Sequence, residues 1–402
     1  MTAALQDETV STPLSRCVGD TDGFLEHFWG HAPLCRRAGD ASRFAPLLSF
    51  PDIDVILSTM PLRLPWFSMV QDGRALDPRG FTVADRGTDL SGAPDLLAIS
   101  DRFRGGATLI LYRLNVWWPP LVRFCRLLEL ELSHPVTAAA FLTPARSQGL
   151  EVHRDDQEVF VLQTVGSKEW SVWAPASGPG AGTGPVDREA LGNPMLTVEL
   201  EPGDCLYVPR GFPHVAVGRE ETSLHISVGA HPVTYRDLLR RAVDALSTPD
   251  LDEGLPPGFD RGGEHLAPEV RRRLRELGRG LEGVDPDQLL AGLHREHRSR
   301  RGPLLDGHLS DVASLHLVDD TTVVRRRPGA FLQLEPDGPG LPGRALVNHR
   351  RFSVSPQEAG ALRQVDDLAR FSVGDLDRHL DGEGRQELVR KLLQVGFLER
   401  VS

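Results

Sequence analysis

The sequence predicts an α+β chain in which a small β-barrel is followed by a helical region and then by a segment that mixes strands and helices. Strand-like runs separated by turn residues extend to about residue 231. From residue 235 the apolar residues recur at a spacing of three to four, which is typical of a helix. With 402 residues, 40% hydrophobic and 25% charged, the chain is long enough for two or three globular domains.

We expect four segments along the chain. Residues 1–20 are polar and predict a loose N-terminal segment, 21–231 the barrel, 232–301 the helical region, and 302–402 the mixed segment. In the last of these, strand-like, helix-like and apolar runs follow one another at Thr322–Arg325, Ala345–Asn348, Pro356–Leu362 and Glu387–Leu398. A Gly/Pro-rich stretch at 175–185 predicts a flexible loop between barrel strands. That loop either covers the mouth of a site or lies in solvent without a role.

The most informative motif is a His-x-Asp pair with a distant histidine. His153 and Asp155 lie in a strand-like run, so their side chains project to the same side while Arg154 points away. His214 lies 59 residues beyond Asp155, at the end of the run GDCLYVPRGFPH. Two imidazoles and one carboxylate hold non-haem Fe(II) and leave positions open for substrate and oxygen. These three residues are therefore predicted to be the catalytic iron ligands of an oxygenase.

Lysine is rare in this chain, which makes one lysine informative. Only Lys168 and Lys391 are lysines among the 45 basic residues. Lys168 opens a strand-like run fifteen residues after His153. Its compact ammonium suits the far carboxylate of 2-oxoglutarate, which it would bind by charge-assisted hydrogen bonds. The alternative is a surface lysine that follows a turn at Gly166.

The run after the distal histidine has polar residues on one face. Alternation places Ser223, His225 and Ser227 on one side of a strand and apolar residues on the other. His225 and Ser227 are candidates for binding the dicarboxylate or for supporting the metal ligands; the alternative is an ordinary solvent face. Asn115 either lines the same cavity or forms a turn.

The segment from 135 to 229 resembles known families in its motifs. Gly203-Asp, Pro209, Gly211 and His214 resemble the second motif of cupins, although Gly218 stands where that motif has Asn and Asp155 where metal-binding cupins usually have His. Together with His153-x-Asp155 and Gly166-x-Lys168-x-Trp170, and with Phe24–Leu34 upstream, the stretch resembles the JmjC-type ribosomal oxygenases, cupin-like protein hydroxylases.

The resemblance implies a fold and an activity. The fold would be a double-stranded β-helix (cupin/JmjC) barrel followed by a helical dimerisation domain and a C-terminal winged helix, in a homodimer. The cofactors would be Fe(II), 2-oxoglutarate and O2, with His153, Asp155 and His214 on iron and Lys168 on 2-oxoglutarate. The substrate would be an arginine or histidine side chain of a ribosomal or other basic protein.

Other functions remain open from the residues alone. The same cofactors serve N-methyl-lysine demethylation and hydroxylation of a peptide natural product. A non-oxidative metal-binding cupin and a binding module without catalysis are further alternatives.

Charge favours a basic protein partner over nucleic acid. Residues 1–231 hold 19 basic and 28 acidic residues, which would attract a basic polypeptide, although acidity that serves only solubility explains the charge equally well. The cluster Arg271–Arg275 lies in a region with 13 basic and 13 acidic residues, and 302–402 holds 13 basic and 15 acidic. A salt-laced helical surface is therefore expected, and nucleic-acid binding is not.

The remaining composition points to a cytoplasmic protein. No signal peptide and no apolar stretch of membrane-spanning length is found, so no membrane association is expected. The four cysteines show neither Cys-x-x-Cys nor zinc spacing, which argues against disulfides and a structural metal.

Overall fold

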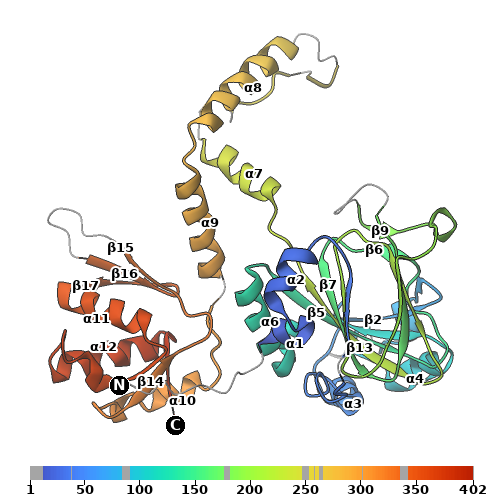
Figure 1. Cartoon of the computed structure of the whole chain (residues 1–402), viewed down its shortest axis with the longest axis horizontal. Helices are drawn as coiled ribbons and strands as arrows, with labels where there is room; N and C mark the ends of the chain where they lie inside the picture. The colour runs from blue at the N-terminus through green and yellow to red at the C-terminus, as the bar shows by residue number, and fades with distance from the viewer. Residues whose placement is uncertain are drawn as a thin grey trace. The chain divides into compact units, whose positions relative to one another are not determined.

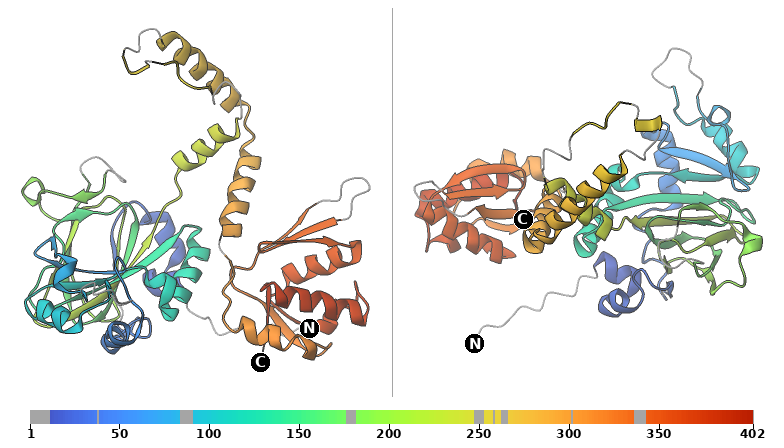
Figure 2. Two further views of the ribbon diagram at one scale, coloured as in Figure 1. Left: turned by 180° about the vertical axis from the view of Figure 1, so that it is seen from behind. Right: turned by 90° about the horizontal axis from the view of Figure 1, so that it is seen from above.

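The computed structural model describes residues 12–37, 39–83, 91–175, 182–246, 253–257, 259–261, 266–300, 302–335 and 343–401. The chain divides into two compact units, Met1–Pro232 and Val233–Ser402. Each unit is described by itself, and Figures 1 and 2 show their elements.

Two antiparallel sheets build the first unit. The larger has the strand order β1-β11-β7-β13-β5-β4-β2-β3, and the smaller has the order β10-β8-β12-β6-β9. The strands are β1 (Leu34–Arg36), β2 (Phe67–Gln71), β3 (Arg74–Ala75), β4 (Thr108–Leu111), β5 (Val136–Thr143), β6 (His153–Arg154), β7 (Glu158–Val165), β8 (Lys168–Val172), β9 (Gly184–Pro185), β10 (Leu196–Leu200), β11 (Cys205–Val208), β12 (His214–Gly218) and β13 (Ser223–Ala230).

A buried cluster joins the two sheets. Val161 of β7 and Leu206 of β11 come from the larger sheet, and Trp170 of β8 and Leu200 of β10 come from the smaller one. Because all of these side chains leave water together, the sheets are held face to face as the two walls of a barrel.

Helices cover the outer face of the larger sheet. These are α1 (Pro13–Val18), α2 (Thr21–His27), α3 (Phe50–Thr59), α4 (Leu96–Arg104), α5 (Leu114–Trp117) and α6 (Pro119–Leu132). Among them α6 contacts β5 and β13, on the side where Figures 1 and 2 also show α1 and α2. The alternation predicted for β13 is confirmed, since Leu224, Ile226 and Val228 pack into this helix-covered core.

Two expectations for the first unit need correction. The loose segment expected over residues 1–20 is wrong for 13–18, because these form α1, with Leu14 and Cys17 buried and the Thr12 side chain capping the helix; residues 1–11 lie outside the described ranges. In the predicted 175–185 loop, Gly184–Pro185 form β9, which pairs with β6. Residues 176–181 of that loop are not among the described residues.

The second unit begins with three helices, α7 (Tyr235–Ala245), α8 (Ala267–Glu282) and α9 (Pro286–Arg300). A capping box of Thr234 and Asp237 starts α7. The salt-laced surface predicted for this region is found on α8, where Arg272 lies 2.7 Å from both Glu269 and Glu276.

The rest of the second unit has its own apolar core and two three-stranded sheets, β18-β14-β19 and β15-β16-β17. Its elements are α10 (His308–Ala313), β14 (Val323–Arg326), β15 (Leu332–Glu335), β16 (Gly343–Val347), β17 (Arg350–Val354), α11 (Pro356–Asp367), β18 (Arg370–Ser372), α12 (Gly382–Gln394) and β19 (Leu398–Arg400). The two predicted strands and two predicted helices are confirmed as β14, β16, α11 and α12, whereas α10, β15, β17 and β18 were not predicted.

Two further expectations concern the whole chain. All four cysteines lie in the described ranges and are free thiols. None of the helices that the structure describes combines the length and the apolarity needed to traverse a bilayer.

Candidate metal centre

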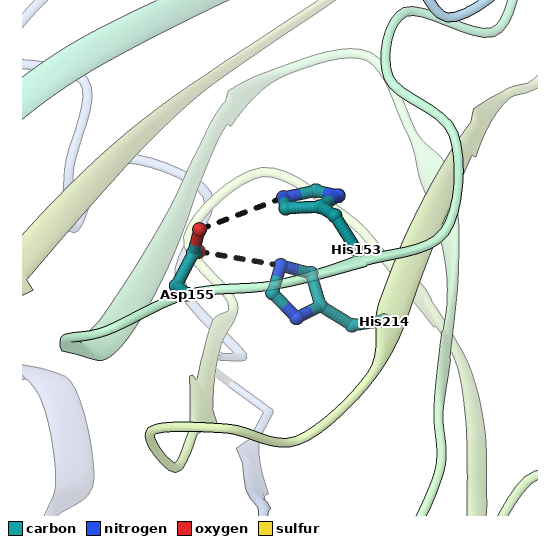
Figure 3. A group of neighbouring side chains, drawn as sticks. All are labelled: His153, Asp155 and His214. Atoms are coloured by element: carbon teal, nitrogen blue, oxygen red, sulfur yellow. Dashed lines mark ion pairs between the residues drawn. The ribbon is translucent and has the colours of Figure 1, made fainter. Parts of the chain in front are cut away.

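Three predicted side chains converge where β6 meets β12. His153 and His214 are paired residues of these two strands, and Asp155 follows β6 directly. One Asp155 oxygen lies 3.7 Å from His153 Nε2, and the other lies 3.5 Å from His214 Nε2 (Figure 3). Both spacings exceed a hydrogen bond, so the three groups face a common point without bonding directly to one another.

The backbone turn before β12 fixes this convergence. Gly211 adopts a left-handed φ of 81°, and its N–H donates to the Asp155 carbonyl at 2.9 Å. A glycine suits this position because a side chain there would be strained. The turn therefore ties the segment that carries Asp155 to the segment that ends in His214.

Each histidine is held in one tautomer by its own backbone. His153 Nδ1 lies 2.8 Å from the Glu151 carbonyl, and His214 Nδ1 lies 3.0 Å from the Phe212 carbonyl. A carbonyl only accepts, so Nδ1 carries the hydrogen and Nε2 keeps its lone pair toward the common point. Burial, and secondly the nearby His153, lowers the pKa of His214 to about 4. His214 is therefore neutral at ordinary pH, as a metal ligand must be.

The donor set fits a non-haem iron. One ligand atom from each of His153, Asp155 and His214 lies within 4.8 Å of the others. Two imidazole nitrogens and one carboxylate oxygen form the 2-His-1-carboxylate arrangement typical of Fe(II) oxygenases.

A cavity of about 570 Å³ adjoins the three residues, and both sheets line it. Its walls include all the other residues predicted for the site, Lys168, His225 and Ser227. The six candidates thus face one space inside the barrel, although they come from four different parts of the sequence.

Lys168 is buried, with only 3% of its surface exposed. Its Nζ donates to Thr143 Oγ1 at 2.7 Å and lies 3.2 Å from His225 Nδ1. Burial lowers the pKa of Lys168 to about 7. The structure pairs it with no carboxylate among the described residues, and the alternative of a surface lysine is wrong.

His225 and Ser227 face the cavity from β13. The His225 ring stacks on Phe141 with centroids 4.9 Å apart, and the Trp170 ring meets it edge-on at 5.3 Å. Burial, together with the charge of Lys168, lowers the pKa of His225 well below its usual value. Because His225 is buried, the alternative of a solvent face on this strand is wrong for it.

Several cavity residues were not predicted. Thr143 accepts from Lys168 and lies 3.0 Å from Thr108 Oγ1, and Trp170 stacks near His214 with ring centroids 6.0 Å apart. The Trp170 Nε1 is buried and has no hydrogen-bond partner within the described part of the chain. Strand alternation could have predicted that Trp170 lines the cavity, since it stands two residues after Lys168 and shares its face of β8.

Neither interpretation of Asn115 is correct. It lies in the short helix α5, where its side chain donates to the Val136 carbonyl and accepts from the Ala138 N–H, each at 3.1 Å. It therefore holds α5 against β5 and is absent from the cavity wall.

Gly218, where the cupin motif has Asn, is explained by close packing. A Cβ at this position would lie 3.0 Å from the Ser147 carbonyl oxygen and 3.1 Å from that of Pro144. The Gly218 N–H also donates to the Ser147 carbonyl at 2.9 Å. The backbone of residues 144–147 occupies the space that a side chain would need.

Comparisons with known proteins agree with this architecture. Residues 118–238 match the JmjC domain family. Ribosomal oxygenase 1 of Gallus gallus is 32% identical over 239 residues, which cover 58% of this chain and 38% of the relative. The bifunctional lysine-specific demethylase and histidyl-hydroxylase NO66 of Dictyostelium discoideum is 38% identical over 157 residues, which cover 36% of this chain and 30% of the relative. This chain thus spans well under half the length of these curated relatives.

A solved structure has the same fold over almost the whole chain. The Escherichia coli ribosomal oxygenase YcfD aligns with a TM-score of 0.51 and 18% identity, covering 96% of this chain and 99% of that one. At this level of identity the likeness concerns the fold alone.

Proposed function

We propose that this chain, which matches the JmjC domain family over residues 118–238 and is similar to ribosomal oxygenases, is a Fe(II)- and 2-oxoglutarate-dependent oxygenase that hydroxylates a protein side chain. The observation that carries the proposal is the convergence of His153, Asp155 and His214 in one cavity with the buried Lys168. The three would hold the iron, which supplies the oxidation of a C–H bond with O2 and 2-oxoglutarate when bound.

Lys168 and Thr143 would bind the far carboxylate of 2-oxoglutarate. Burial lowers the pKa of Lys168 to about 7, and a bound anion would stabilise its protonated form, since a nearby negative charge favours an ammonium. Thr143 Oγ1, at 2.7 Å from Nζ, offers a hydroxyl to the same carboxylate. His225 and Ser227 would line the path between this end and the metal.

Trp170 also supports a ligand in this space. Its Nε1–H is buried beside the cavity without a partner in the described residues, and such a group is costly unless something accepts its hydrogen. An oxygen of the co-substrate would meet this need.

The rest of the cavity would exclude water and orient the substrate side chain. We propose an arginine or histidine of a ribosomal or other basic protein as the substrate. The net acidity of residues 1–231 supports a basic partner.

Demethylation of N-methyl-lysine is the second candidate, because relatives named for both lysine demethylation and histidyl hydroxylation match this chain. Mass spectrometry of treated substrate separates the two reactions, since hydroxylation adds an oxygen atom and demethylation removes a methyl group. The third candidate is an enzyme that uses the same cofactors to hydroxylate a peptide natural product. It predicts 2-oxoglutarate turnover without a reaction on any ribosomal protein.

A non-oxidative metal cupin and a non-catalytic binding module are less well supported. Asp155 stands where metal-binding cupins usually have a histidine, and two imidazoles with one carboxylate are the donor set typical of Fe(II) oxygenases. A buried lysine that lines the same cavity is expected where an anionic co-substrate binds, and neither alternative requires such a co-substrate.

We further propose that residues 232–301 are a homodimerisation region, that 302–402 form a winged helix without a nucleic-acid function, and that the protein acts in the cytoplasm. The apolar side chains Leu239 on α7 and Leu274 on α8 support dimerisation, since each is about 60% exposed within its unit. Light scattering on the purified chain should give a dimer, and the double substitution Leu239→Glu/Leu274→Glu should give a monomer. A wild-type monomer would refute this part of the proposal.

Succinate production tests the activity. The chain is incubated with Fe(II) and 2-oxoglutarate, with and without ribosomal proteins, and wild type is compared with His214→Ala. We expect succinate from wild type, an increase with the correct substrate, and none from His214→Ala. The absence of any 2-oxoglutarate turnover by wild type, together with tight binding of zinc or manganese, would favour the non-oxidative cupin.

A further inference from the structure

A carboxamide on the cavity wall has no role in the proposed function so far. Gln157 stands two residues after Asp155, directly before β7, and lines the cavity. Its Oε1 is buried, and its side chain has no hydrogen-bond partner among the residues that the structure describes. Native interiors seldom leave such an atom unpaired, because its desolvation is then not compensated.

Gly229 makes room for this carboxamide. It follows His225 and Ser227 on the cavity face of β13, and a Cβ built at Gly229 would collide with Oε1 and Cδ of Gln157. Gln157 therefore occupies, from the facing segment, the space that any other residue at 229 would fill.

Gln157 lies away from the end of the cavity that Lys168 occupies. Lys168 contacts His225, and Gly229 stands four residues further along the same strand, or roughly 13 Å at about 3.3 Å per residue. Next to Gly229, Thr137 of β5 accepts from or donates to His231 Nε2 at 3.0 Å, and both of these also line the cavity. A co-substrate held at Lys168 and reaching the metal would leave this end to the substrate.

We propose that Gln157 is a specificity-determining residue, whose carboxamide hydrogen-bonds an N–H group on the substrate side chain. This inference rests on the proposed function and names the part of the chain that would select a guanidinium or an imidazole. A carboxamide offers an acceptor oxygen and a donor NH2 and exchanges them by rotation about its last torsion. A side chain without a polar group leaves the carboxamide unpaired, and sites of this kind reject such analogues strongly.

Binding of small side-chain probes tests the proposal without knowledge of the natural substrate. The probes are the N-acetyl methylamides of arginine, histidine and norleucine, titrated calorimetrically under nitrogen into the chain loaded with Fe(II) and 2-oxoglutarate. We expect arginine or histidine to bind at least about tenfold more tightly than norleucine, which is the effect of one or two hydrogen bonds. Equal binding of all three probes by wild type would overturn the proposal.

Three variants assign the preference to Gln157. Gln157→Met, of similar size, should abolish the preference, and Gln157→Glu, which keeps an acceptor, should retain it. Gly229→Ala should weaken the binding of all three probes, because the added Cβ drives the Gln157 side chain into the cavity. Gln71→Met is the matched control, since the Gln71 amide donates to the Gly105 carbonyl outside the cavity. A preference that persists in Gln157→Met would contradict the role.

Two readouts separate this inference from its premise. The melting temperature of Gln157→Met should be no lower than that of wild type, because the substitution removes an unpaired buried atom and leaves no bond broken. Succinate formation by wild type decides the proposed function, whereas the preference among probes is measured by binding alone. A chain that binds arginine preferentially but makes no succinate would keep the inference about Gln157 and reject the oxygenase.

Discussion

The ammonium of Lys168 lies 3.2 Å from Nδ1 of His225, a residue 57 positions later in the chain. Burial and the charge of Lys168 lower the pKa of His225, and burial alone lowers that of Lys168; both side chains line the cavity. A cation in such a place costs free energy in the empty protein and would be relieved by a bound anion.

Replacing Lys168 with Met should abolish the binding of 2-oxoglutarate without unfolding the protein. The variant loses the charge for the carboxylate and also loses a desolvated ammonium, so its free energy of unfolding at pH 7 should equal or exceed that of wild type. Calorimetry with 2-oxoglutarate and urea unfolding measure the two effects. Lys391→Met, at the exposed lysine of α12, is the control. Normal binding of 2-oxoglutarate by Lys168→Met would show that Lys168 does not bind its carboxylate.

The depressed pKa of Lys168 predicts how the stability of the ligand-free protein depends on pH. Its folded pKa of about 7 lies below the ordinary lysine value of 10.5, so between these values the unfolded chain binds more protons than the folded one. The free energy of unfolding should therefore gain about 1.4 kcal/mol per pH unit from this group as the pH rises from 7 toward 10. Denaturant titrations of wild type and Lys168→Met across this range isolate the contribution, and two parallel curves would contradict it.

Binding of 2-oxoglutarate should also weaken above pH 7. The ammonium must be protonated to bind the carboxylate, so the dissociation constant should rise toward tenfold per pH unit above the folded pKa. Calorimetry in buffers of different ionisation enthalpy should detect proton uptake on binding at pH 8. Binding at pH 8 that takes up no proton would show that Lys168 stays charged in the empty cavity.

Asp155→Asn should abolish metal binding while the fold is kept. The amide retains the shape of the carboxylate but loses its charge, and Fe(II) or Co(II) affinity should fall by more than about a hundredfold, beyond what supporting residues usually contribute. Metal titration followed by visible absorption of Co(II) measures this. Asp156→Asn, at the exposed neighbouring carboxylate, should bind metal as wild type does. Equal losses in both variants would indicate general damage to the segment.

Gly218→Asn restores the residue of the cupin motif and should destabilise this protein. The added Cβ meets two backbone carbonyls at 3.0 and 3.1 Å, and such crowding typically costs about 1–3 kcal/mol. Gly192→Asn is the control, since nothing lies within 4 Å of a Cβ there. Thermal unfolding of the two variants measures the difference, and equal stabilities would show that the backbone of residues 144–147 shifts at little cost to admit the side chain.

The convergence of the candidate metal ligands could be predicted from the sequence because their residue types and local spacing are typical of a metal site. The two-residue period of a strand was enough to predict that His153 and Asp155 lie on one side, and a motif at the start of another strand was enough to predict His214. His225 was found in the same way, from alternation along one run. Lys168 stood out because lysine is so scarce in this chain.

The rest depended on contacts between distant segments. Thr143 became a candidate only when β5 placed it beside Lys168, and Gln157 only when Gly229 was found opposite it. Helix α1 was missed because its six residues give too short a pattern, and its stability comes from burial of Leu14 and Cys17 against the larger sheet. Asn115 was misread because its partners, Val136 and Ala138, come from a strand about twenty residues away.

The hydrogen bonds from His153 and His214 to carbonyls two residues upstream have a consequence for how such a protein diversifies. Each ring takes its aim from a main-chain atom, which no substitution of a neighbouring side chain removes. Mutations that reshape the cavity wall around Gly229 can therefore accumulate while the two histidine rings keep their orientation. The same scaffold can acquire different cavity walls in this way while its candidate donor set for a metal is inherited intact.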